Sequence, residues 1–179
     1  MALTKKQVGV LKGMLTGAAV ILATIIFGVW NNPFGFAENL GGYERLVIAI
    51  KSAVLPAICL AVSVGRLAKH RFFTPDDIDG GGLSKGTEQA IILQSLLQNT
   101  LEQFSIAVIA YLSWAVVMPV TWLSVVPLAA IVFVIGRIMF FTGYKYGAPS
   151  RAIGFTLSFY MSLAMLICVM VAVLWHSVY

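Results

Sequence analysis

Two polar stretches interrupt an otherwise apolar sequence, and together they could form a binding site. In the later stretch, Arg137 stands within an apolar segment, Tyr144 follows seven residues on, and Arg151 follows fourteen residues on. Residues three, four and seven apart overlie one another on a helix, so Arg137, Phe140 or Phe141, and Tyr144 share one face. Lipid disfavours an unpaired cation. Arg137 therefore needs a partner or a ligand.

The earlier polar stretch lies in the apolar segment 87–117. Ser95, Asn99 and Glu102 are spaced there by four and three residues, and Gln98 lies beside them four residues before the carboxylate. Glu102 is ~22 Å along a helix that begins with this segment, at 1.5 Å per residue. A carboxylate at that depth costs about 2.5–3.5 kcal/mol when it faces lipid. It is expected to face protein, water or a ligand.

The two stretches predict a site for a small zwitterion. Arg137, on the neighbouring span, is the expected partner of Glu102. One interpretation is purely structural, with this ion pair and a buried asparagine holding helices together. The functional interpretation rests on the number of polar groups. One half of the membrane holds a carboxylate, two arginines, an asparagine and a tyrosine, which is more than an ion pair that joins two helices requires. A ligand with carboxylates and an ammonium would match them.

Arg151 is the candidate for chemistry. It follows Pro149 and Ser150, and so falls in the first turn of the next helix, where the helix dipole already disfavours a cation. It is either a basic flank of a membrane span or part of an anion site made by guanidinium and helix terminus. A thiolate is one such anion. Because free thiols titrate near about 8.5, stabilising the thiolate by about 1.4 kcal/mol raises the reactive fraction about tenfold.

Composition places these residues in a membrane. The 179 residues are 60% hydrophobic and 11% charged, which is outside the range of ordinary soluble domains. The net charge of +5 comes from cations at the ends of apolar segments, which indicates topology rather than nucleic-acid binding. Five segments are long enough to cross a bilayer. They are roughly 9–31, 45–67, 87–117, 120–144 and 150–176.

The charges also predict an orientation. The basic residues that precede the first span, and those between spans two and three and between spans four and five, lie on one side of the membrane, so the amino terminus is expected to be cytoplasmic. A bacterial inner membrane and a eukaryotic endomembrane fit the sequence equally well. We expect one membrane domain, 1–179, in which 1–45 is an additional span with its external loop and 46–179 is a four-helix bundle.

Several other sites are excluded by spacing. Cys59 and Cys168 lie within apolar segments and form neither a disulfide framework nor a metal-binding pair. The Asp77–Gly80 stretch lacks carboxylates at the first and last positions of a calcium loop. His70, between two cations, is expected to be a solvated residue beside the membrane. No metal is expected.

The combination of Asn99 and Glu102 with Arg137, Tyr144 and Arg151 resembles the MAPEG family, the membrane-associated proteins in eicosanoid and glutathione metabolism. The similarity covers roughly residues 46–176. It implies an all-α integral membrane fold, a four-helix bundle of the MAPEG type to which the first span is added. It also implies a homotrimer that binds glutathione between protomers near the cytoplasmic side.

By the family's motif, glutathione would contact Asn99, Glu102, Arg137 and Tyr144, and Arg151 would stabilise its thiolate. Gln98 joins these candidates as a neutral neighbour. Two departures stand out: catalytic members usually have an arginine where this chain has Ser95, and some have a tyrosine where it has Phe140. Either Arg66 or Arg71, near the cytoplasmic end of the second span, could replace the missing arginine or serve the second substrate.

The resemblance implies a membrane-bound, glutathione-dependent transferase or peroxidase that acts on a lipophilic small molecule entering from the bilayer. The alternative is a noncatalytic member that keeps the fold as a membrane interaction or lipid-binding module, which Ser95 favours. A transporter or channel fits less well, because the polar residues gather in one half of the membrane and do not line a continuous path.

Overall fold

The computed structural model describes residues 3–178, with side chains as far as Trp175. The described residues form long helices joined by short turns, and they contain no β-strand. The helices are α1 (Lys5–Asn31), α2 (Gly42–Phe73), α3 (Glu88–Val117), α4 (Val125–Gly143) and α5 (Ala148–Val178). Three short 3-10 helices lie between them: η1 (Pro75–Asp77), η2 (Val120–Trp122) and η3 (Tyr144–Tyr146).

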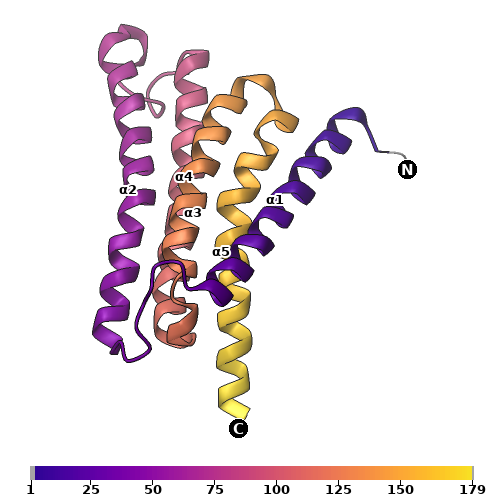
Figure 1. The fold of residues 1–179 in the computed structure, drawn as a ribbon. Coiled ribbons are helices and arrows are strands. Elements are labelled where there is room, and N and C mark those ends of the chain that lie inside the picture. The colour runs from indigo at the N-terminus through magenta and orange to yellow at the C-terminus, as the bar shows by residue number, and fades with distance from the viewer. Residues whose placement is uncertain (1–2, 179) are drawn as a thin grey trace.

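All five long helices among the described residues are long and apolar enough to cross a membrane. This confirms the predicted all-α membrane fold and its five spans. In Figure 1, α2, α3, α4 and α5 run side by side, and α1 crosses in front of α5 at an inclination. The extensive contacts of α1 are with α5, so the added span is attached to one edge of the bundle.

Several predicted boundaries are corrected. α1 begins at Lys5 and not near 9, because Thr4 and Gln7 form a capping box in which each side chain accepts a bond from the other's backbone N–H. α2 continues to Phe73 and not 67, since Leu67 is still buried against the leucines of α3 and no proline intervenes before Pro75. The fourth apolar segment opens and closes with 3-10 turns, which leaves a shorter α-helix between them.

The bundle has its main core toward the end that contains the connection between α3 and α4. Trp114, Phe133, Met161 and Met165 are almost completely buried there, from three different helices. The Trp114 indole Nε1–H donates to the backbone oxygen of Trp122, 3.0 Å away, so the buried ring has its polar atom satisfied. Large apolar side chains therefore fill this end of the bundle.

At the other end, α4 and α5 approach closely through glycines. A Cβ atom at Gly154 would lie 2.4 Å from the backbone nitrogen of Phe140, and one at Gly143 would lie 2.4 Å from the backbone oxygen of Ser150. Only a residue without a side chain allows backbones to pack at this distance, which is the common use of glycine between membrane helices. The approach fixes the start of α5 against the end of α4.

The loop between α2 and α3 is closed by a buried carboxylate. Asp77, 1% exposed, accepts bonds from the Thr87 backbone N–H (2.7 Å) and hydroxyl (2.6 Å). Its Oδ2 also pairs with His70 Nε2 at 2.8 Å. The prediction that His70 is solvated is therefore wrong, because the loop folds back and brings the carboxylate to it. Hydrogen bonds from Thr87 foremost, and then the contact with His70, hold the pKa of Asp77 below its usual value.

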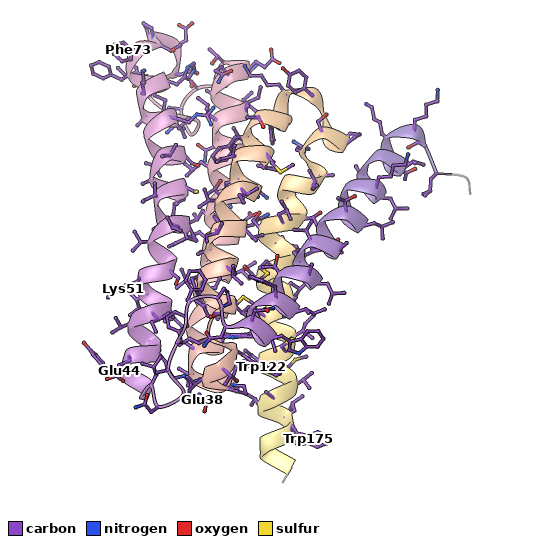
Figure 2. The ribbon with its side chains drawn as sticks, in the orientation of Figure 1. Glu38, Glu44, Lys51, Phe73, Trp122 and Trp175 are labelled. Carbon is purple, nitrogen blue, oxygen red and sulfur yellow. The ribbon has the colours of Figure 1, made fainter. Side chains whose placement is uncertain are left out.

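The two ends of the bundle differ in their connections. The described start of α1, the α2–α3 loop and the α4–α5 turn lie at one end of the bundle, and the end of α5 lies at the other (Figure 1). Figure 2 shows Phe73 at the first end and Glu38, Glu44 and Trp122 toward the opposite one. This grouping agrees with the charge-based topology. That the first end is cytoplasmic stays a prediction.

Candidate functional site

A cavity of about 710 Å³ opens between α3, α5 and the first turns of α1. It lies in the half of the bundle that contains the α4–α5 turn. Five of the six predicted site residues line it directly, and the sixth lies behind its wall. Its polar lining residues are Gln94, Ser95, Gln98, Asn99, Glu102, Tyr144, Arg151, Thr156 and Tyr160.

One wall is a face of α3. Ser95, Asn99 and Glu102 line the cavity together with Gln98, as the helical spacing predicts. The Gln98 Nε2–H donates to Glu102 Oε1 at 2.9 Å, and both side chains remain exposed in the single chain. The Ser95 hydroxyl donates to the Ile91 backbone oxygen at 2.9 Å. The wall therefore presents one carboxylate and neutral polar groups.

The predicted pairing of Glu102 with Arg137 is wrong. Arg137 is 0% exposed, and its Nη1 donates to Asn99 Oδ1 at 2.8 Å while its Nη2 donates to the Ser158 hydroxyl at 2.6 Å. The guanidinium bonds to Asn99 of α3 and Ser158 of α5 and does not line the cavity, and among the described side chains it forms no ion pair with Glu102. Arg137 can act on a ligand through Asn99, whose amide it orients.

A series of cation–ring and ring–ring contacts connects the buried arginine to the lining of the cavity. The Arg137 guanidinium carbon lies 4.6 Å from the centre of the Phe140 ring, and that ring meets Tyr144 edge-on at 5.5 Å between centres. The Arg151 guanidinium carbon in turn lies 4.4 Å from the centre of the Tyr144 ring. The predicted shared face of Arg137, Phe140 and Tyr144 is thus confirmed. Ring contacts of this kind hold a cation in place without neutralising it.

Arg151 occupies the first turn of α5, as its place in the sequence predicts. Its side chain is half-buried and lines the cavity. Among the described side chains, Arg151 forms no ion pair. Its charge, together with the positive end of the α5 dipole, makes this corner of the cavity favourable for an anion.

A second, smaller cavity of about 240 Å³ adjoins the first, and Gln94 and Ser95 line both. It contains the cations Arg71 and Lys85. Arg71 Nη2 donates to Gln94 Oε1 at 3.2 Å, so this arginine reaches the shared boundary. Of the two arginines considered as replacements at position 95, Arg71 is the one placed beside it.

The other candidate, Arg66, belongs to a different place. Its guanidinium carbon lies 5.4 Å from the centre of the Phe141 ring. With Lys69 and Phe73 it lines a separate basic pocket at the end of α2. Arg66 is therefore a useful control for the role of Arg71.

Sequence reasoning missed two parts of the site. Ser158 holds Arg137 from α5, but a serine in an apolar helix carries no distinguishing signal. Val10 and Met14 of α1 line the cavity, although the first span was predicted only as an addition. A signal for that contact exists in the sequence: Gly9, Gly13 and Gly17 repeat every four residues on one face of α1.

The comparisons with known proteins agree with the residue pattern. The MAPEG family profile matches residues 46–171, which begin after α1 and include the α3, α4 and α5 residues of the cavity. No curated protein and no solved structure matches the chain. With most of its length matched, this multi-pass membrane protein belongs to the MAPEG family.

Proposed function

We propose that the protein is a membrane-bound, glutathione-dependent transferase acting on lipophilic electrophiles. The observation that carries the proposal is the cavity itself, which brings together the carboxylate of Glu102, the phenol of Tyr144 and the guanidinium of Arg151. Membership of the MAPEG family supports it. A soluble tripeptide and a membrane-dissolved substrate can both reach a site that lies at one end of a bundle of spans.

Glutathione has charges that this cavity can complement. Its ammonium fits against Glu102, and the amides of Gln98 and Asn99 offer donors and acceptors to its peptide groups. Its two carboxylates need cations. Arg71, which reaches the boundary between the two cavities through Gln94, supplies one where Ser95 offers none. Phe140 has no hydroxyl, so we assign the hydrogen bond to the thiol to Tyr144, the phenol whose ring contacts Arg151.

The chemistry is stabilisation of a thiolate. Arg151 and the start of α5 favour the anion, so the thiol releases its proton to solvent on binding. The sulfur then attacks an electrophilic carbon. With an aryl halide, a C–S bond forms and the halide leaves with its bonding electrons.

Reduction of a peroxide is also open to this site. There the thiolate attacks one oxygen, the O–O bond breaks, and glutathione sulfenic acid and an alcohol form once the alkoxide takes a proton from solvent. A second glutathione then attacks the sulfenic sulfur, which gives the disulfide and water.

We also propose that the working form is a homotrimer. Gln98 and Glu102 remain exposed in the single chain although they lie within a span of α3. Exposure of such groups to lipid is costly, so a neighbouring protomer that covers this face would relieve the cost while leaving the cavity open to the cytosol. The mass of the purified protein in detergent tests this assignment, with a single protomer as the contradicting result.

The decisive experiment compares wild-type protein with Arg151→Ala and Lys145→Ala. Lys145 is an exposed cation of the same turn and does not line the cavity, so it controls for a general loss of charge. We expect wild-type protein to show the ultraviolet difference signal of a bound thiolate and to conjugate an aryl halide. Arg151→Ala should reduce both at least about tenfold at neutral pH, and Lys145→Ala should leave both nearly unchanged.

Two results would contradict this assignment. If Arg151→Ala keeps the thiolate signal, another cation stabilises the sulfur. If the wild-type protein at millimolar glutathione gives neither the thiolate signal nor the conjugate, the protein is not a glutathione transferase. The folded state of each variant is checked by its elution volume in detergent.

A second candidate function has one observation in its favour. Ser95 places a neutral side chain, bonded to its own helix, at the position where catalytic relatives are expected to have an arginine. A cavity with fewer cations suits a lipid-binding or membrane interaction module. Arg71→Ala separates the candidates, because it should raise the KM for glutathione in an enzyme, whereas Arg66→Ala should not.

A further inference from the structure

The basic pocket at the end of α2 is a second candidate for binding a ligand. Its volume of about 490 Å³ lies within the ~300–1,000 Å³ range of small-molecule sites. Its walls come from two helices: Arg66, Lys69, His70 and Phe73 from α2, and Gln89 and Leu93 from α3. None of the described residues that line it is an aspartate or a glutamate, whereas Glu102 lines the main cavity. The pocket therefore suits a ligand with net negative charge.

Helical spacing separates this pocket from the main cavity. Lys69, His70 and Phe73 follow Arg66 by three, four and seven residues, so α2 presents all four on one face. On α3, nine residues separate Leu93 from Glu102. That distance is about two and a half turns at 3.6 residues per turn, which puts the two on opposite faces of the helix. The pocket is therefore a separate site and does not extend the glutathione cavity.

Two cations of the pocket are free to meet an anion. Arg66 and Lys69 are exposed, and among the described side chains neither forms an ion pair. The contact of the Arg66 guanidinium with the Phe141 ring of α4 holds this cation in place without neutralising it. The third basic side chain differs, because His70 Nε2 already pairs with Asp77 at 2.8 Å. An anion in the pocket would therefore meet Arg66 and Lys69 first.

The pocket lies at the level of lipid headgroups. Arg45 and Arg66 are ~32 Å apart along α2 at 1.5 Å per residue, close to the ~30 Å thickness of the hydrocarbon core. Arg66 thus lies near one membrane surface, and Figure 2 shows Phe73 at this end of the bundle. The Phe73 ring, 72% exposed, and Leu93 add apolar surface beside the cations. A phospholipid uses both kinds of surface, whereas a free anion uses only the cations.

We propose that this pocket binds the phosphate group of an anionic phospholipid from the adjoining leaflet. Arg66 and Lys69 supply the positive charge, and Thr74 and Gln89 offer hydrogen-bond donors to the phosphate oxygens. Basic pockets between membrane helices bind lipid headgroups through this chemistry. The site uses none of the residues assigned to glutathione, so it does not depend on the proposed transferase function.

The test follows lipid binding with an indole at the pocket. Full-length Phe73→Trp is placed in phosphatidylcholine nanodiscs, in which a rising fraction of the lipid is replaced by chain-brominated phosphatidylglycerol or chain-brominated phosphatidylcholine. Quenching of the new indole is the difference from wild-type protein. We expect saturation with phosphatidylglycerol at a mole fraction at least about tenfold lower than with phosphatidylcholine, because each basic residue contributes about fivefold.

Charge variants of this reporter protein assign the preference to the pocket. Arg66→Gln/Lys69→Gln should abolish the preference for phosphatidylglycerol, and Arg66→Lys should retain most of it because the charge is kept. The matched control is Lys5→Gln/Lys145→Gln, which removes two exposed cations from the same end of the bundle. These two lysines line none of the cavities described above, so the control should keep the preference.

A second reporter and a folding check support the comparison. Phe72, 75% exposed beside Phe73, does not line the pocket, so Phe72→Trp is the reporter if Phe73→Trp does not fold. The elution volume in detergent shows whether each variant is folded. Inorganic phosphate at millimolar concentration and constant ionic strength should not reverse the quenching by phosphatidylglycerol.

Four results would overturn the inference. Equal quenching by the two lipids would mean that the pocket does not select an anionic headgroup, and an undiminished preference in Arg66→Gln/Lys69→Gln would mean that the lipid binds elsewhere. An equal loss in Lys5→Gln/Lys145→Gln would assign the preference to overall surface charge. Reversal by inorganic phosphate would make a soluble anion the ligand. Because glutathione is absent throughout, none of these results bears on the transferase assignment.

Discussion

The two halves of the bundle use the same helices in opposite ways. In the half that contains the connection between α3 and α4, the buried rings of Trp114 and Phe133 fill the space between the helices. Toward the other end, the same α3 and α5 leave a cavity of about 710 Å³ lined by Asn99, Glu102 and Arg151. From this difference we infer that the packing of the half with the buried rings, the sealed half, holds the helices in register. The half with the cavity, the open half, can then expose polar groups without losing its shape.

The largest expected effect is in the sealed half. Trp114→Ala removes a fully buried ring and its bond to the Trp122 backbone, and it should lower the free energy of unfolding by about 3–5 kcal/mol. Gln98→Ala, in the open half, should change it little because the bond that is lost joins Gln98 to Glu102 one turn away on the same helix. Thermal unfolding in one detergent measures both. Equal losses would mean that the two halves do not divide their roles as described.

The next effect lies at the border between cavity and core. Asn99→Ala leaves the Nη1 of buried Arg137 without its acceptor, which should cost about 2 kcal/mol of stability. Asn99→Asp is the matched variant, since a carboxylate oxygen can accept the same bond, and it should retain most of the stability. The same unfolding assay applies. If both variants are equally destabilised, the shape of the amide matters more than its bond to the guanidinium.

A smaller effect is expected where α4 and α5 meet behind the cavity. Gly154→Ala places a methyl group against the backbone of Phe140 and should cost about 1 kcal/mol by forcing the helices apart. Because Arg151 lies one turn earlier on α5, the thiolate signal should fall as well. Gly65→Ala is the control, since a Cβ atom there meets no other atom within 4 Å. An unaltered signal in Gly154→Ala would show that the cavity tolerates movement of α5.

The smallest effect concerns the loop beside the cavity and depends on pH. Because the pKa of Asp77 is lowered in the folded protein, its ionised form stabilises the loop above the carboxyl's ordinary pKa of about 3.9. This contribution is lost as the pH falls through the lower, folded pKa. Proteolysis of the α2–α3 loop should therefore increase in acid, and Asp77→Asn should be cut readily already at neutral pH. Equal resistance of Asp77→Asn at neutral pH would contradict the role of the carboxylate.

Much of this arrangement could be predicted from the sequence. The five spans follow from hydropathy and length, and Ser95, Asn99 and Glu102 share a face because helical spacing requires it. The position of Arg151 in the first turn of α5 follows from Pro149, which favours a helix start. These inferences depend only on residues close together in the chain.

The failures concern contacts between distant segments. Asn99 and Ser158, not Glu102, bond to Arg137, because the rotation of α3 relative to α4 and α5 is set by packing. His70 meets Asp77 only because the intervening loop turns back. Periodicity identifies which residues share a face, but it does not tell which helix that face meets.

Proton release on glutathione binding tests the central claim most directly. If Arg151 stabilises the thiolate, glutathione that binds at a pH below the pKa of its free thiol must release a proton from each occupied site. Calorimetry in buffers of different ionisation enthalpy measures the number of protons released. We predict close to one proton per bound glutathione in the wild type and almost none in Arg151→Ala. Binding to the wild type without proton release would show that the cavity holds the thiol and would contradict the account.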